Sequence, residues 1–228
     1  MNFLQFLKVF RKTFFTPLKA RKSYSQCAED LMVDHLLQSS IKSGAKGFYV
    51  DVGCHHPKRG SNTYRLYKHG WKGILVDMED DKVLAAKLAR PRDLVIKAAV
   101  SDREESVTIY SPSAFSTNAT IAKEIYCNDS GFKPTSSVNT TRLDKILREN
   151  NSPQKIDFMS IDVEGNDFKV LKSFSLDEFH PQIICVENHC VHDGVDKLLS
   201  SEIHKFLSKK DYSLCGISGP STIYKSAS

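Results

Sequence analysis

Short apolar runs that alternate with helical patterns constrain the fold of this 228-residue chain more than any other feature. Four such runs predict buried strands, at Phe48–Val52, Ile74–Val76, Phe158–Ile161 and Ile183–Val186. Helical patterns lie between them, so successive strands are expected to run parallel through right-handed crossovers. The sequence therefore predicts one α/β domain built on a doubly wound, mostly parallel sheet.

Three further strands complete a predicted sheet of seven. Leu94–Val100 is expected to be the third strand along the chain, and Tyr212–Ile217 and Thr222–Tyr224 flank a Ser-Gly-Pro turn typical of a closing hairpin. Before the hairpin, Val195–Leu207 has the apolar spacing of one amphipathic helix. Val107–Tyr110 alternates polar and apolar residues and is expected to form an extra strand.

A long polar stretch interrupts this pattern. Residues 111–137 are rich in Ser, Thr, Asn and Pro and show no clear periodicity. An irregular segment of this length inside a compact domain is usually functional. Its aromatic residues Phe115, Tyr126 and Phe132 could stack on a sugar ring, so we expect the stretch to form the acceptor loop.

Acidic residues follow four of the predicted strands. Asp51 and Asp77 stand at the ends of the first two, and Asp162 and Glu187 follow the later pair. In an open α/β sheet, ligands bind beyond the carboxyl ends of the strands. The sequence therefore predicts a polar site along one edge of the sheet.

The first strand leads directly into the sequence YVDVGCHHP, residues 49–57. Gly53 allows a tight turn and a close approach to a ligand. Asp77 is placed to accept the hydroxyls of a ribose. The sequence lacks the later glycines of GxGxxG, which disfavours a dinucleotide pyrophosphate. A methyltransferase using S-adenosylmethionine is preferred, and a dinucleotide-dependent oxidoreductase remains the alternative.

Five motifs in order resemble those of FkbM-type methyltransferases. They are YVDVGCHHP, SNTYRLYKHGWKGILVDME (61–79), AAVSD (98–102), TTRLDKIL (140–147) and MSIDVEGNDFKVL (159–171), and SQCAED (25–30) is similar to the family's first helix. The resemblance implies a class I, Rossmann-like methyltransferase fold, S-adenosylmethionine as donor, and O-methylation. Acceptors in that family include sugar hydroxyls, so a sugar, glycan or glycolipid is the expected acceptor.

The resemblance also implies roles for individual residues. Asp51 and Gly53 would line the methionine end of the cofactor, and Asp77 would hold its ribose. Ser101 and Asp102 would border the adenine, and Asp162 would lie beside the methyl group. Cys54 and His55 depart from the residues more usual in the family at these positions.

Two arrangements could remove the proton of an acceptor hydroxyl. Asp162, Glu187 and Asn188 offer hard oxygen ligands, similar to the magnesium site of catechol O-methyltransferases, that suit Mg²⁺ or Mn²⁺. Alternatively, His189 would act as the general base. Asp162, Glu187 and His189 are therefore the candidate catalytic residues. A binding module without catalysis remains a further alternative.

The basic charge of the chain is confined to its first residues. Residues 1–22 carry six basic side chains and no acid, whereas residues 23–228 carry a net charge of −1. Apolar and basic residues in this arm follow helical spacing, which is typical of a helix lying on an anionic membrane surface. A near-neutral domain makes a nucleic-acid substrate unlikely by charge. Six cysteines without a CxxC pair favour a cytoplasmic protein. The arm would place this protein in peripheral contact with a membrane surface.

Overall fold

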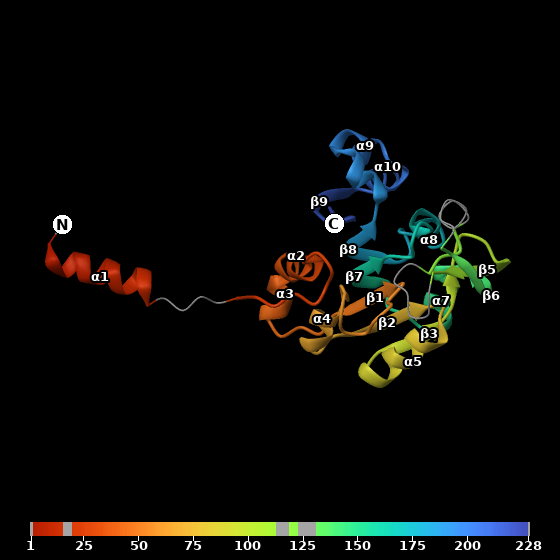
Figure 1. The fold of residues 1–228 in the computed structure, drawn as a ribbon, viewed down its shortest axis with the longest axis horizontal. Helices are drawn as coiled ribbons and strands as arrows, with labels where there is room; N and C mark the ends of the chain where they lie inside the picture. Colours follow the sequence, from red (N-terminus) through yellow and green to blue (C-terminus); the bar gives the residue numbers. More distant parts are fainter. Residues whose placement is uncertain (1, 16–19, 113–118, 123–130, 228) are drawn as a thin grey trace.

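A seven-stranded sheet forms the centre of the molecule (Figure 1). The computed structural model describes residues 2–15, 20–112, 119–122 and 131–227. The strand order is β3-β2-β1-β7-β8-β10-β9; β10 runs antiparallel to both β8 and β9, and all the other adjacent strands are parallel. The strands are β1 Phe48–Val52, β2 Lys72–Asp77, β3 Leu94–Lys97, β7 Lys155–Ile161, β8 His180–Glu187, β9 Tyr212–Ser218 and β10 Ser221–Ser226. The predicted seven-stranded, mostly parallel sheet with a C-terminal hairpin is confirmed.

Helices cover both faces of this sheet, as a doubly wound fold requires. One face packs on α2 Glu29–Leu36, α4 Tyr64–Lys68 and α5 Asp80–Ala89, and the other on α7 Leu143–Glu149, α8 Asp167–Lys172 and α10 Glu202–Ser208. Alternation along β1 separates the two cores, because Tyr49 belongs to the first and Val50 and Val52 to the second. Each core therefore takes alternate residues from the same strands.

The predicted strand Leu94–Val100 is divided in the structure. Its first part, β3, pairs with β2, and the chain then leaves the sheet where the Ala98 amide donates to the Asp77 carbonyl at 2.9 Å. Its last part, β4 Ala99–Val100, joins a separate three-stranded sheet with β6 Lys133–Thr141 and β5 Ser106–Ser111. β5 confirms the predicted extra strand.

Two other expectations need correction. Residues 133–137 belong to β6 and are not irregular; the sequence hides this strand because its side chains are polar and mostly exposed on both faces. The single helix expected at Val195–Leu207 is two helices, α9 Val195–Ser200 and α10. Ser201 separates them with an extended backbone, and its hydroxyl caps α10 by accepting from the His204 amide at 3.2 Å.

The remaining helices lie at the start of the chain and after β8. They are α1 Phe3–Phe14, α3 Gln38–Lys42 and the 3₁₀ helix η1 His189–Asp193. Figure 1 shows α1 well separated from the rest of the molecule. Across the described residues, every helix is too short or too polar to cross a membrane.

Candidate active site

The strand order gathers the four predicted acids at one edge of the sheet. β1 lies between β2 and β7, and β7 pairs with β8, so the carboxyl ends of these four strands are consecutive. Asp51 and Asp77 stand on the ends of β1 and β2, Asp162 follows β7, and Glu187 ends β8. Sequence position alone therefore located the edge at which a site forms.

A tight turn after β1 brings two strand ends into contact. Gly53 has φ +82°, and its amide and that of Cys54 both donate to the Val76 carbonyl, at 2.9 and 3.1 Å. A Cβ atom on Gly53 would lie 1.7 Å from the backbone oxygen of Asp162. Only glycine satisfies both the positive φ and this close approach. The turn therefore sets the distance between the ends of β1 and β7.

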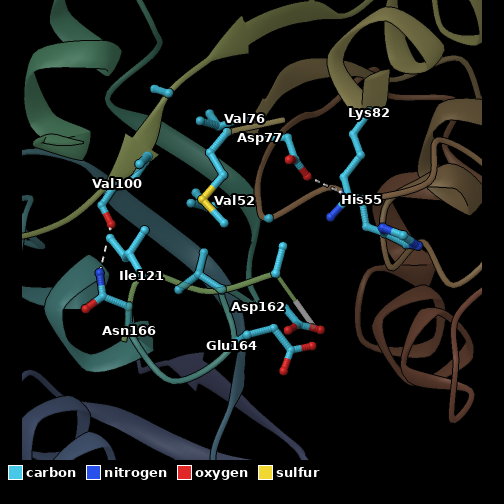
Figure 2. A pocket seen from close by; sticks show the side chains of 16 residues that line it. Val52, His55, Val76, Asp77, Lys82, Val100, Ile121, Asp162, Glu164 and Asn166 are labelled. Atoms are coloured by element: carbon cyan, nitrogen blue, oxygen red, sulfur yellow. Dashed lines mark hydrogen bonds between the residues drawn. The ribbon is translucent and has the colours of Figure 1, made fainter. Parts of the chain in front are cut away.

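A narrow cavity lies beside this turn. Figure 2 shows Val52, Val76 and Val100 on its apolar side, with Asp77 and Asp162 on the polar side. Its volume is about 50 Å³, and Ala119 and Ile121 also line it. This is far below the ~300–1,000 Å³ of typical ligand pockets. Two residues of the expected acceptor loop, Ala119 and Ile121, thus lie against this cavity, whereas Phe115 and Tyr126 lie outside the described residues.

A second, wider cavity of about 630 Å³ adjoins the first. Its lining is polar, and the hydroxyl, amide, imidazole and guanidinium groups come from Ser23, Ser25, His56, Arg59, Ser61, Asn62 and Ser160. Gly53, His55, Asp162 and Glu164 line both cavities. Asp162 therefore stands where the two spaces meet, and Asp51 lines the wider one.

Asp77 is held by the backbone around it. Its Oδ2 accepts from the His55 amide at 2.9 Å (Figure 2), and its Oδ1 accepts from the Glu79 amide at 3.1 Å. Burial raises its pKa, and Lys82 opposes this effect. Lys82 is itself buried, lines the narrow cavity and forms an ion pair with Glu79. The carboxylate thus has a fixed orientation at the end of β2.

Asp51 belongs to a buried network on the face of the sheet that α4 and α5 cover. Its Oδ2 accepts from the Thr63 hydroxyl at 2.5 Å, and Thr63 in turn accepts from Arg90 at 2.9 Å. Arg90 has no exposed surface and also binds Asp93 and Tyr49, each at 2.7 Å. Burial raises the pKa of Asp51 to about 6, whereas the positive charge of Arg90 lowers it.

A cluster of carboxylates occupies the ends of β7 and β8. Ligand-capable oxygens of Asp162, Asp167 and Glu187 all lie within 4.8 Å of one another. Burial and the charges of neighbouring acids raise the pKa of Asp162 and of Glu187. Glu187 is 7% exposed, and its Oε2 has no hydrogen-bond partner; the nearest basic atom, His189 Nε2, is 3.5 Å away. This unpaired buried oxygen fits a cation.

Asp167 takes the place in this cluster that the sequence assigned to Asn188. Asp167 accepts from the amides of Val163 and Gly165, each at 3.0 Å, which holds the loop after β7. The Asn188 amide is engaged elsewhere: its oxygen caps η1 through Cys190, and its nitrogen donates to Ser201 at 3.0 Å. The DVEGND sequence contained the signal for Asp167, as an acid directly after the strand-end loop.

The other candidate residues lie at the margin of the site. Ser101 and Asp102 line neither of the two cavities; Ala98, Ala99 and Val100 line the narrow one instead. Asp102 forms an ion pair with Lys172 at 3.3 Å. His189 is half exposed at the start of η1, and partial burial with the charge of His192 lowers its pKa. Arg90 and Lys82 were not selected from the sequence, because a basic residue in or directly after a helix is ordinary until the fold buries it.

Solved methyltransferase structures are similar to this chain at low sequence identity. An O-methyltransferase from Bacillus cereus solved with SAH is similar over 97% of this chain and 88% of its own, at 11% identity and a TM-score of 0.48. A methyltransferase from Geobacter sulfurreducens is similar over 98% of this chain and 88% of its own, at 10% identity and a TM-score of 0.44. No curated protein matches the sequence. The sheet topology itself therefore carries the assignment to the class I methyltransferase fold.

The family is decided by the sequence match. Residues 51–214 match the Methyltransferase FkbM domain, which covers most of the chain and every strand end described above. This match favours methyl transfer over the oxidoreductase alternative. With the seven-stranded topology and the cavities at the strand ends, it leads to one conclusion: the chain belongs to the FkbM family of S-adenosylmethionine-dependent methyltransferases.

Proposed function

We propose that the protein methylates a hydroxyl oxygen of a sugar, either free or in a glycan or glycolipid. The observation that carries this proposal is the meeting of the two cavities at Asp162. A donor in the narrow cavity and an acceptor in the wide one would approach each other from opposite sides, as an in-line displacement requires. The polar lining of the wide cavity complements a polyhydroxylated molecule.

The donor would lie along the edge formed by β1 and β2. Asp77 would accept the ribose hydroxyls, and the methionine end would reach the junction of the two cavities, between the Gly53 turn and Asp51 on the wide side. S-adenosylmethionine, when bound, supplies a methyl group activated by its sulfonium, so no protein nucleophile is needed. The adenosine requires more room than about 50 Å³, and Ala119 and Ile121 must move outward to admit it. Ser101 and Asp102 would then border the adenine only indirectly, with Val100 between them and the bound cofactor.

Proton removal would take place at the ends of β7 and β8. In one arrangement, His189 would receive the proton of the acceptor hydroxyl. In the alternative arrangement, Asp162, Glu187 and Asp167 would hold Mg²⁺ or Mn²⁺, since three carboxylates suit a hard cation. Such a cation lowers the pKa of an acceptor hydroxyl. The unpaired Oε2 of Glu187 supports this binding.

Calorimetric titration with S-adenosylhomocysteine tests the donor site without knowledge of the acceptor. We expect saturable binding by the wild type and a loss of tenfold or more in Asp77→Asn, because one acceptor oxygen for the ribose is removed. Asp177→Asn, an exposed residue paired with Lys210, is the matched control and should bind normally. Equal binding by Asp77→Asn and the control would refute the role of Asp77.

Methyl transfer and metal binding test the acceptor side. Labelled S-adenosylmethionine with a panel of sugars should give methyl ethers, and turnover should fall in His189→Gln; binding without any turnover would favour the non-catalytic alternative. Mn²⁺ binding, followed by electron paramagnetic resonance, should be lost in Glu187→Gln and retained in Glu149→Gln, which changes an exposed helical residue. Retained Mn²⁺ in the first variant would exclude the carboxylate cluster as the metal site.

A further inference from the structure

The first helix carries an apolar stripe that the domain does not cover. At 3.6 residues per turn, Phe3, Phe6, Leu7, Phe10 and Phe14 fall within an arc of about 100°. The phenyl rings contact one another along this stripe, with centroids 6.0 Å apart for Phe6 and Phe10 and 4.6 Å for Phe10 and Phe14. A continuous aromatic surface therefore runs the length of α1.

This stripe is exposed although its helix is well formed. Asn2 and Gln5 make a reciprocal capping box at the start of α1, which fixes where the helix begins. Every described residue from 2 to 15 is exposed, and the side chains of Phe3 and Phe14 are 74% and 69% exposed. Apolar patches of this kind mark a surface that binds something.

The charges around the stripe indicate what it binds. Lys8 and Lys12 lie opposite the apolar arc and Arg11 flanks it, as expected for a helix lying flat with its basic side chains toward lipid headgroups. Residues 1–22 contain no acid. Pairing of two such arms would bring like charges together, which opposes self-association. The domain, residues 23–228, is nearly neutral and offers the basic arm little electrostatic attraction.

We propose that residues 1–22 attach the protein to an anionic lipid surface, with α1 lying in the plane of the interface. The phenyl rings enter the boundary between headgroups and acyl chains, and the basic side chains contact the anionic headgroups. The site on the domain is separate from this arm. The attachment therefore does not depend on the identity of the methyl acceptor.

Vesicle cosedimentation of the full chain tests the proposal. Binding should be strong to phosphatidylcholine vesicles containing phosphatidylserine and weak to phosphatidylcholine alone. Changing Lys8, Arg11 and Lys12 together to Gln should weaken binding about a hundredfold, at about fivefold for each charge. The double variant Phe6→Glu/Phe10→Glu should lose binding by tenfold or more, because it places charge in the apolar stripe.

Leu88→Glu is the matched control, since Leu88 is an exposed apolar residue, at 76%, on α5 of the domain. It should bind vesicles like the wild type. Emission from the buried Trp71 reports that every variant is folded. The proposal would be overturned if the Leu88 variant lost as much vesicle binding as the arm variants, or if both arm variants bound vesicles like the wild type. A dimer without lipid that the Phe6→Glu/Phe10→Glu change dissociates would also overturn it, in favour of a second copy of this chain.

Discussion

Replacing Gly53 with alanine should be among the most damaging small changes in the protein. A non-glycine residue in the left-handed region costs about 1–2 kcal/mol. The added Cβ would also lie 1.7 Å from the Asp162 backbone oxygen, which cannot rotate away as a side chain could. Overpacking typically costs ~1–3 kcal/mol, and a rigid backbone neighbour places this case at the upper end. The free energy of unfolding should therefore fall by about 4–5 kcal/mol.

Gly44→Ala is the control that isolates the clash. Gly44 has φ +76°, but an added Cβ there would meet nothing within 4 Å. The free energy of unfolding of Gly44→Ala should fall only by the cost of a left-handed backbone, about 1–2 kcal/mol. Urea denaturation at equilibrium measures both free energies, and the difference of about 3 kcal/mol corresponds to roughly 6–12 °C in melting temperature for a chain of this size.

The same two variants connect stability to the site. Gly53→Ala moves the end of β7 away from β1, so binding of S-adenosylhomocysteine should weaken more than in Gly44→Ala at temperatures where both are folded. Equal stabilities for the two variants would refute the reasoning, because the close approach of Gly53 to Asp162 would then carry no energetic cost.

Three more predictions concern the buried polar residues of the site. Asp51→Asn should stabilise the apoprotein at pH 7 by up to about 3 kcal/mol, because the folded pKa of Asp51, about 6, exceeds its ordinary value of 3.8. As pH rises from about 4 to 6, the wild type should therefore lose more stability than the variant, as denaturation at several pH values would show. Thr63→Val should cost about 1–3 kcal/mol in urea denaturation, because it leaves Asp51 and Arg90 each short of a hydrogen bond, whereas Thr63→Ser should retain stability. His55, whose pKa is lowered to about 4 by burial and by Lys82, should remain neutral at pH 5.5 in imidazole NMR spectra; a titration near pH 6.5 would contradict the burial of its ring.

Some expectations failed where local patterns carried no information about pairing. β6 has no apolar alternation, because its side chains are exposed and only its backbone pairing with β5 and β4 makes it a strand. The break at Ala98 depends on where the chain leaves one sheet for another, and Leu94–Val100 has the same apolar pattern on both sides of it. Backbone pairing between distant segments is a tertiary property.

The sequence by itself determined the strands that form the central sheet, the acids at their ends and the amphipathic arm. These follow from periodicity, because a buried parallel strand must be apolar and its carboxyl end must leave the core at one edge. Only the tertiary structure decided that Asp167 joins Asp162 and Glu187, and that Arg90 connects Tyr49 to Thr63. Apart from the step from Asp162 to Asp167 within one loop, these contacts join residues far apart in the chain, and their distances are set by how strands and helices pack together.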